Sequence, residues 1–415
     1  MISLLPRRPA TVVLSISSSL VGYGEIVTNT NVLPAASHRT ARIAAIDVVR
    51  GVAIIGTLGT NIWVFSHPWG LLGMLSAPVT PETPDAAAVT QLVFMTLTQG
   101  KFLALLSLVF GMGVAIQHGA AVRRGARWPG RYLWRATLLF LDGAINYVLI
   151  AEFDVLMGYA VTGAVVAYLL LTSPRAQRRM IAVFGALHVL VITVIVAAIV
   201  LTGANGDAAL PNGRNPYADG TFLDLVLFRL DNLVVFRAEA VLIGFLSLAL
   251  FLLGARLLGV GVFAPEGARV RRRLLVAGAI ALPVDVVLGV AGGTAGLFAE
   301  RYLLAPIVAL GLLTLLAELS LRLGTDGWIA RRAREVGRVA LSAYMLQNLL
   351  AGALFYGWGL GLAESAAGAR VPVTIAAFIV LTAAIVVLAH LWLRRFELGP
   401  VEWLWKRAAQ LGTRA

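Results

Sequence analysis

Long apolar stretches, separated by short polar segments, dominate the chain. An α-helix needs about 20 apolar residues to cross the hydrocarbon core of a bilayer. Runs of roughly that length lie near residues 43–65, 101–118, 131–150, 154–173, 179–203, 238–260, 272–293, 301–321, 336–358 and 372–393. The pattern predicts an all-α fold, a polytopic membrane bundle of about ten transmembrane helices.

The composition agrees with this class. The chain has 415 residues, a mean hydropathy of +0.86 and only 13% charged residues. It contains no cysteine, which excludes disulfides and thiolate ligands. The five histidines are scattered and form no metal-binding motif. We therefore expect no metal site and no bound cofactor.

The basic residues alternate from one connection to the next. Of the 34 Lys and Arg residues, 27 lie in the leader, the tail and every second connection, and 5 lie in the others; Arg50 and Lys101 fall within spans. By the positive-inside rule this predicts that both termini are cytoplasmic. The net charge of +13 is thereby explained by topology, and we expect no nucleic-acid partner.

Three regions are expected along the chain. Residues 1–40 are predicted to be a disordered leader, residues 41–396 the transmembrane domain, and residues 397–415 a cytoplasmic interfacial helix and tail. Trp403 and Trp405 would anchor that last helix. Residues 221–236 have the spacing of an amphipathic helix on the outer interface.

Asp47 and Arg50 are the most unusual residues of the first span. Arg at a helix centre in hydrocarbon costs on the order of 3 kcal/mol or more. Their spacing of three residues allows an ion pair, and Asn61 lies three turns further on, on roughly the same side. The stripe would form one wall of a substrate tunnel. The alternative is a structural ion pair between helices.

Further polar residues are expected near the outer side. Lys101 opens the second span, Asp142 lies within the third, Asp154 follows the outer turn, Arg237 opens the sixth span and Asp285 interrupts the seventh. Ionisable groups in membranes usually face the bundle interior. Such a cavity would suit a hydroxyl-rich or anionic ligand. The alternative is snorkelling of the longer side chains to the interface.

Candidates for a general base and a group in the ninth span complete the set. His67, just beyond the first span, has the chemistry of a general base, and Asp154 is a second candidate for that role. The ninth span carries Arg338, Tyr344 and Gln347, which would line a site or join helices through hydrogen bonds.

Several segments together resemble the bacterial YeiB-like membrane proteins, the family labelled domain of unknown function 418. They are RIAAIDVVRGVAIIGTLGTNI, KFLALLSLVFGMGVAI, FDVLMGYAVTGAVV, GRVALSAYMLQNLLAGALFYGWGLGL and RRFELGPVEWLWK. They follow the family's order and extend from about residue 42 to residue 408. The leader has no counterpart among them.

The first span is also similar to that of membrane acetyltransferases of the heparan glucosaminide type. Those proteins move an acyl group from cytoplasmic acyl-CoA to a sugar. The resemblance implies that Asp47, Arg50 and Asn61 correspond to positions lining such a tunnel. The acyltransferases use a histidine near the outer end of this span. Here Asn61 occupies one such place, and His67 lies closer to the span than in the glucosaminide enzyme.

Three functions follow as hypotheses. The first is an acyltransferase with acyl-CoA as co-substrate and a glycan or glycolipid acceptor, in which His67 or Asp154 is the base and Arg50 and Asn61 stabilise the oxyanion. The second is a transporter or flippase of a lipid or small polar solute, consistent with the glycine-interrupted segment 289–296. The third is a structural or partner-binding protein of the lipid bilayer, whose buried charges serve helix assembly only.

Overall fold

The chain folds into helices of very different lengths. The computed structural model describes residues 35–76, 85–203 and 214–411, and within these ranges it has no β-strand. Most of the predicted leader, residues 1–34, lies outside the described residues. The α-helices are α1 (Ala35–Phe65), α2 (Gly70–Ser76), α3 (Ala86–Thr98), α4 (Lys101–Arg123), α5 (Arg131–Leu149), α6 (Leu156–Leu169), α7 (Pro174–Thr202), α8 (Phe222–Asp231), α9 (Leu233–Leu242), α10 (Gly244–Gly259), α11 (Ala268–Ala291), α12 (Gly293–Ala299), α13 (Ala305–Leu323), α14 (Trp328–Arg338), α15 (Ala340–Phe355), α16 (Leu362–Ser365), α17 (Arg370–Leu393) and α18 (Pro400–Leu411). Three short elements complete the fold: η1 (Pro265–Gly267), the π-helix η2 (Glu300–Leu304) and η3 (Ala367–Ala369).

The number of spans differs from the expectation. Each of the ten predicted runs contains a helix, but by length and composition six helical stretches of the described chain could cross a membrane. They are Ala44–Phe65, Ala86–Arg123, Pro174–Thr202, Pro265–Ala291, Gly293–Leu323 and Ala367–Leu393. Counting α9 and α10, bent by 45° at their junction, as one span makes seven. The apolar helices α6 and α15 are shorter, with 14 and 16 residues.

One expected loop is a helix. Residues 66–100 were expected to connect the first two spans, yet α3 lies within them and continues into α4 as a stretch of 38 residues. Lys101 therefore does not open a span. It lies at the interruption, after Gly100, whose φ of +71° is readily adopted by glycine. Gln99 and Lys101 interrupt the apolar pattern of this stretch, so the part before them was not expected to be a helix.

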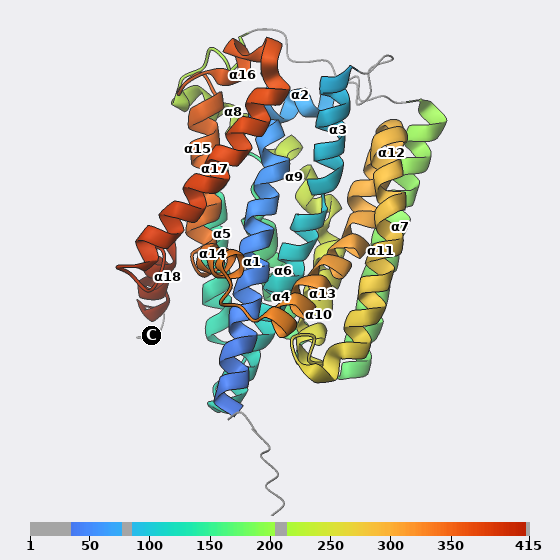
Figure 1. Ribbon diagram of the computed structural model, residues 1–415, viewed down its shortest axis with the longest axis vertical. Helices are drawn as coiled ribbons and strands as arrows, with labels where there is room; N and C mark the ends of the chain where they lie inside the picture. The colour runs from blue at the N-terminus through green and yellow to red at the C-terminus, as the bar shows by residue number, and fades with distance from the viewer. Residues whose placement is uncertain (1–34, 77–84, 204–213, 412–415) are drawn as a thin grey trace, which may run out of the picture.

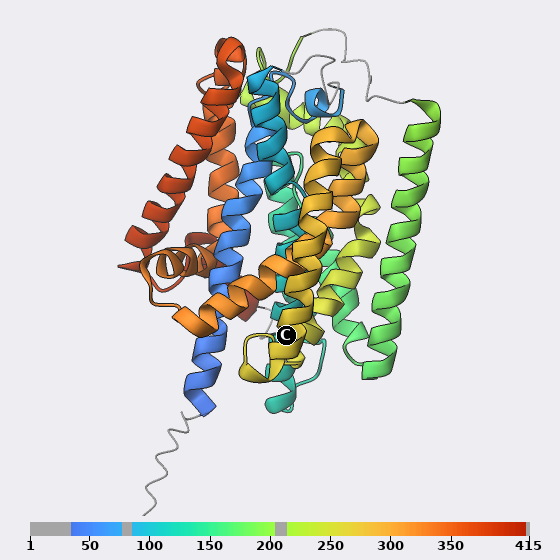
Figure 2. The ribbon, with the colours of Figure 1, turned by 45° about the vertical axis from the view of Figure 1, so that its right-hand side comes forward.

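The first span is central and the seventh helix peripheral. In α1, 72% of the membrane-length window is buried, against 11% in α7. Figure 2 shows α7 at the edge of the bundle, with α1 inside it. Beyond its basic first turns α7 is largely apolar, so the exposed side chains of this part suit contact with lipid.

Glycine lets three pairs of helices approach closely. A Cβ at Gly278 of α11 would lie 2.6 Å from the Cα of Gly311 in α13. In the same way, α4 and α10 meet backbone to backbone at Gly111 and Gly254. The third pair, α1 and α14, meets at Gly337. Close packing through small residues is typical of helix association in membranes.

The connections lie at two opposite ends of the bundle. Figure 1 shows α2, α8 and α16 at the upper end and the turn before α11 at the lower end. The segment predicted as one interfacial helix over 221–236 is divided at Asn232 into α8 and α9. Thr221 and Asp224 form a capping box that starts α8. The cytoplasmic location of the termini stays a prediction.

Candidate functional site

Lys101, Asp285 and Glu300 form a buried group of charges, which we call the central cluster. Lys101 Nζ lies 2.5 Å from Glu300 Oε1 and 2.8 Å from Asp285 Oδ2. It also donates to the carbonyl oxygen of Thr96 at 2.6 Å. Gln99 Nε2 donates to Glu300 Oε2 at 3.3 Å. Both carboxylate residues are 0% exposed, so their charges have no access to solvent.

The central cluster lies where three helical stretches are irregular. Lys101 begins α4 after the break at Gly100, whose Cβ position faces the backbone of Arg301. Glu300 begins the π-helix η2, and such widened turns often occur at functional sites. Asp285 lies two residues after Pro283, inside α11. Each interruption frees local backbone geometry just where an ionisable side chain enters the bundle.

A second ion pair adjoins the central cluster. Arg301 Nε donates to Glu239 Oε1 at 3.1 Å, and the Tyr302 hydroxyl donates to the same oxygen at 3.0 Å. His188 Nε2 lies 2.9 Å from the Tyr302 carbonyl oxygen. Arg301 and Tyr302 directly follow Glu300 in η2, so the two groups share one turn of helix.

Two small cavities extend from these groups. The larger, of about 40 Å³, has Asp154, Tyr159, Glu239 and Ser247 among its lining residues. The smaller, of about 20 Å³, has Gly100, Arg301 and Ser247 among its own. A water molecule needs roughly 10–15 Å³ of such volume, so these spaces have room for a few waters.

Polar contacts continue from the larger cavity toward α1. Arg237 Nη1 donates to the carbonyl oxygen of Asp154 at 2.9 Å. Tyr344, which is buried, lies close to Val155 and Asn348. Asn61 Nδ2 then donates to Asn348 Oδ1 at 3.2 Å. We call the series from Asn61 through these residues and Glu239 to the central cluster the polar path.

Gln347 lies beside the polar path, where Nε2 donates to Thr57 Oγ1 at 3.4 Å. Thr57 lies one turn before Asn61 in α1, and Gln347 directly precedes Asn348 in α15. The two hydrogen bonds therefore join the same pair of helices. Buried polar contacts of this kind also hold helices together in membranes.

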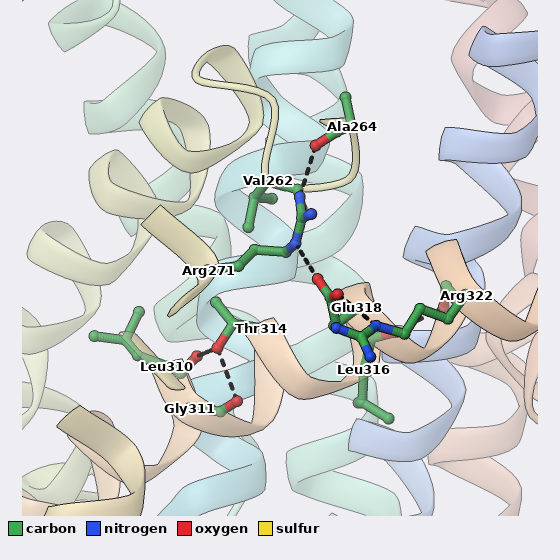
Figure 3. A network of polar contacts seen from close by, with 10 residues as sticks. Val262, Ala264, Arg271, Leu310, Gly311, Thr314, Leu316, Glu318 and Arg322 are labelled. Atoms are coloured by element: carbon green, nitrogen blue, oxygen red, sulfur yellow. Dashed lines mark hydrogen bonds and ion pairs between the residues drawn. The ribbon is translucent and has the colours of Figure 1, made fainter. Parts of the chain in front are cut away.

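A polar clamp holds α11 and α13, the helices that flank the central cluster. Arg271 Nε donates to Glu318 Oε2 at 2.7 Å, and Arg271 Nη1 donates to the carbonyl oxygens of Val262 and Ala264 (Figure 3). Glu318 also accepts a hydrogen bond from Arg322 at 2.7 Å. Together with the crossing at Gly278 and Gly311, this clamp sets the position of Asp285 relative to Glu300.

Asp47 and Arg50 form the expected ion pair, but away from the polar path. Arg50 Nη1 lies 2.8 Å from Asp47 Oδ1 and 3.3 Å from the carbonyl oxygen of Gly337 in α14. The side chain of Arg50 is 30% exposed. Arg334 and Arg338 of α14 lie close enough for their charges to act on Asp47. The pair thus belongs to a basic surface.

Three other candidates are also separate. Arg338 is exposed and donates to the carbonyl oxygen of Glu397 at 3.0 Å. Asp142 accepts a hydrogen bond from Trp405 of α18, so it holds the last helix against α5. His67 lies beyond the end of α1. The expected single cavity containing all these side chains is not formed by the described residues.

His67 and Asp154 are engaged in local structure. His67 Nδ1 accepts a hydrogen bond from the backbone of Trp69 at 3.1 Å. Burial, together with the charge of Arg370, lowers the pKa of His67 to about 4, which makes it a weak base at neutral pH. Asp154 accepts hydrogen bonds from Asn146 Nδ2 at 2.9 Å and from the backbone of Met157 at 3.1 Å.

Sequence reasoning did not find Glu300, Gln99 or Arg301 as site residues. Glu300 lies at the edge of an apolar run, where a charged residue is readily assigned to the membrane interface. Glu300 reaches Lys101 only because of the π-turn of η2 and because α3 takes the place of the expected loop. The adjacent opposite charges of Glu300 and Arg301 are a signal in the sequence. Such neighbours at the end of a span can each form an ion pair with a different helix, as they do here with Lys101 and Glu239.

Comparisons with known proteins find similar sequences along most of the chain. Residues 260–412 match the family model described as "Protein of unknown function (DUF418)". The chain is 28% identical over 397 residues to "Uncharacterized protein YxaH" of Bacillus subtilis (strain 168), covering 89% of this chain and 94% of that protein. It is 29% identical over 391 residues to "Uncharacterized protein YeiB" of Escherichia coli (strain K12), covering 88% and 96%. The resemblance to YeiB-like, DUF418 proteins that the sequence motifs indicated is therefore confirmed.

Proposed function

We propose that this protein transports a small polar solute across the membrane. The observation that carries the proposal is the central cluster, a fully buried set of charges at three irregular helices. Interrupted helices in transporters expose backbone and charged groups near the middle of the membrane, where substrates and coupling ions bind. Buried ionisable residues in such proteins commonly belong to ion or proton pathways.

The polar path supports this function rather than a purely structural one. Structural ion pairs would need only the two partners. Here polar side chains follow one another from Asn61 and Asn348 past Tyr344 to Arg237 and to Glu239, which lines the larger cavity. The cavities between them have room for water. The α9–α10 bend of 45° lies against both cavities, since Ile243 lines each of them. A change in this bend would widen the path.

Transport is tested with the full chain reconstituted in proteoliposomes without any acyl donor. The probes are radiolabelled sugars, amino acids and carboxylic acids, offered singly. We expect uptake of at least one class, and its loss in Lys101→Met, which leaves two buried carboxylates without their cation. Lys406→Met, on the exposed face of α18, is the matched control and should retain uptake. Equal uptake by protein-free vesicles would contradict the proposal.

Acyl transfer is the second candidate, and one observation favours it. Arg50 is partly exposed beside the basic helix α14, a surface with charges suited to the phosphates of acyl-CoA. The acceptor would be a glycan or glycolipid. Membranes given labelled acetyl-CoA test it, comparing the unmodified protein with Arg50→Ala. Labelled lipid or glycan that depends on Arg50, with no solute uptake in vesicles, would favour this function over transport.

A further inference from the structure

The central cluster and its neighbours carry an unequal number of opposite charges. Lys101 and Arg301 are the cations, and Asp285, Glu300 and Glu239 are the acids. Glu239 is matched by Arg301, which leaves Lys101 between two carboxylates. The other titratable groups near this region are His188, Tyr302, Arg237 and Asp154. His188 and Tyr302 add no charge when neutral, and the opposite charges of Arg237 and Asp154 offset each other. With every acid ionised, the buried group would carry one uncompensated negative charge.

We propose that the central cluster binds one exchangeable proton, held by Asp285. When Asp285 is protonated and neutral, Lys101 and Glu300 remain as an ion pair with no net charge. An uncompensated charge out of reach of water is far more costly than a neutral acid, so protonation is the inexpensive way to bury two carboxyl groups beside one ammonium.

The hydrogen-bond contacts assign the proton to Asp285 rather than Glu300. Both oxygens of Glu300 are contacted by donors, Lys101 at Oε1 and Gln99 at Oε2. Asp285 Oδ2 forms an ion pair with Lys101, and neither oxygen of Asp285 has a geometrically suitable hydrogen-bond donor among the described residues. An ionised carboxylate is stabilised by donors at both oxygens. Glu300, which has a donor at each oxygen, is therefore the charged acid.

The geometry favours a proton over a metal cation. Lys101 Nζ is 2.8 Å from Asp285 Oδ2, so a cation bound at this oxygen would meet the ammonium group at short range. A proton removes the charge of the acid and causes no such repulsion. Thr96 Oγ1, in the residue whose carbonyl oxygen Lys101 contacts, is also without a hydrogen-bond partner in the described chain. It offers a polar group at the edge of the same site.

Infrared spectroscopy of the purified full-length protein tests the site. A protonated carboxyl group has a carbonyl stretching band that shifts in D2O. We expect Asp285→Asn to remove one carboxyl equivalent of this band at neutral pH. Glu300→Gln should remove one as well, because Asp285 then ionises to pair with Lys101. Lys101→Met should add one equivalent, since neither acid keeps a cation.

Asp224→Asn, at the exposed start of α8, is the control and should leave the band unchanged. An unchanged band in both Asp285→Asn and Glu300→Gln would overturn the inference, and these near-isosteric variants keep the test valid even where Lys101→Met does not fold. Use of this proton to drive transport rests on the proposed function. The infrared measurement needs no solute, so it can contradict the proton site without contradicting transport, and the uptake measurement can contradict transport without contradicting the proton site.

Discussion

The α-carbon of Gly337 in α14 lies so close to the backbone of Asp47 in α1 that a Cβ at Gly337 would overlap the carbonyl oxygen of Asp47. Gly51, one turn further along α1, meets the carbonyl oxygen of Ala333 in the same way. The ion pair between Asp47 and Arg50 thus lies at a backbone-to-backbone helix crossing. Arg50 also reaches the carbonyl oxygen of Gly337, which joins charge and packing at one place.

Gly337→Ala should destabilise the protein, because the methyl group has no space between two backbones. Overpacking of this kind typically costs about 1–3 kcal/mol. The measurement is the thermal unfolding midpoint in detergent. Gly113→Ala in α4 is the matched control, since no atom lies within 4 Å of its Cβ position. Equal midpoints for the two variants would show that the crossing tolerates separation.

Arg229 should be irreplaceable even by lysine. Its Nε lies 3.2 Å from Glu152 Oε2, while Nη1 and Nη2 donate to the carbonyl oxygens of Val148 and Ile150. Only the planar guanidinium fork reaches all three acceptors. Removing one partner of a buried ion pair costs about 3–5 kcal/mol. We expect a large fall in the unfolding midpoint of both Arg229→Lys and Arg229→Met.

Arg214→Lys gives the comparison for that experiment, because Arg214 is exposed and lies 3.9 Å from the carboxylate of Asp224. Exposed pairs contribute about 0–1 kcal/mol, so little change is expected. Should Arg229→Lys unfold at the same temperature as Arg214→Lys, the three-acceptor arrangement would not be what stabilises α8.

The connection after α1 should lose stability in acid because of His67. Its pKa is about 4 in the folded protein, below the ordinary 6.5, so the neutral form is the one favoured by folding. That contribution is complete above pH 6.5 and is lost as the pH falls toward 4. His67→Asn keeps an oxygen able to accept from the Trp69 backbone and removes the titration.

The measurement is the unfolding midpoint of the unmodified protein minus that of His67→Asn, followed from pH 7 to pH 4. The difference should decline as the pH falls. A constant difference would mean that His67 titrates alike in the folded and unfolded chain.

Glu402 should hold the last helix in place. Its Oε1 accepts hydrogen bonds from the backbone of Leu341 at 2.8 Å and of Ser342 at 3.2 Å, at the start of α15. A carboxylate there both caps the helix and matches its dipole. In Glu402→Ala we expect α18 to detach, which limited proteolysis detects as faster cleavage near residues 394–399. Glu397→Ala, in the exposed turn before α18, should be cut at the rate of the unmodified protein.

The positions of the helices were largely readable from the chain, whereas the number that span a membrane was not. Apolar length predicts a helix wherever about 20 such residues follow one another. It does not separate α6, with 14 residues, from a true span, because a buried helix has the same composition. The helix α3 was not expected, because its apolar pattern ends at Gln99 and Gly100, where the backbone turns.

The sequence by itself determined the class of the protein, its helical segments, the Asp47–Arg50 pair and the relationship to YeiB-like proteins, because these depend on local spacing and composition. Which charges meet was decided only by the tertiary structure. Lys101 and Glu300 are 199 residues apart and come together through a broken helix, a π-turn and glycine crossings. Long-range electrostatics follow the packing of backbones, and no local pattern in one chain specifies which helices cross.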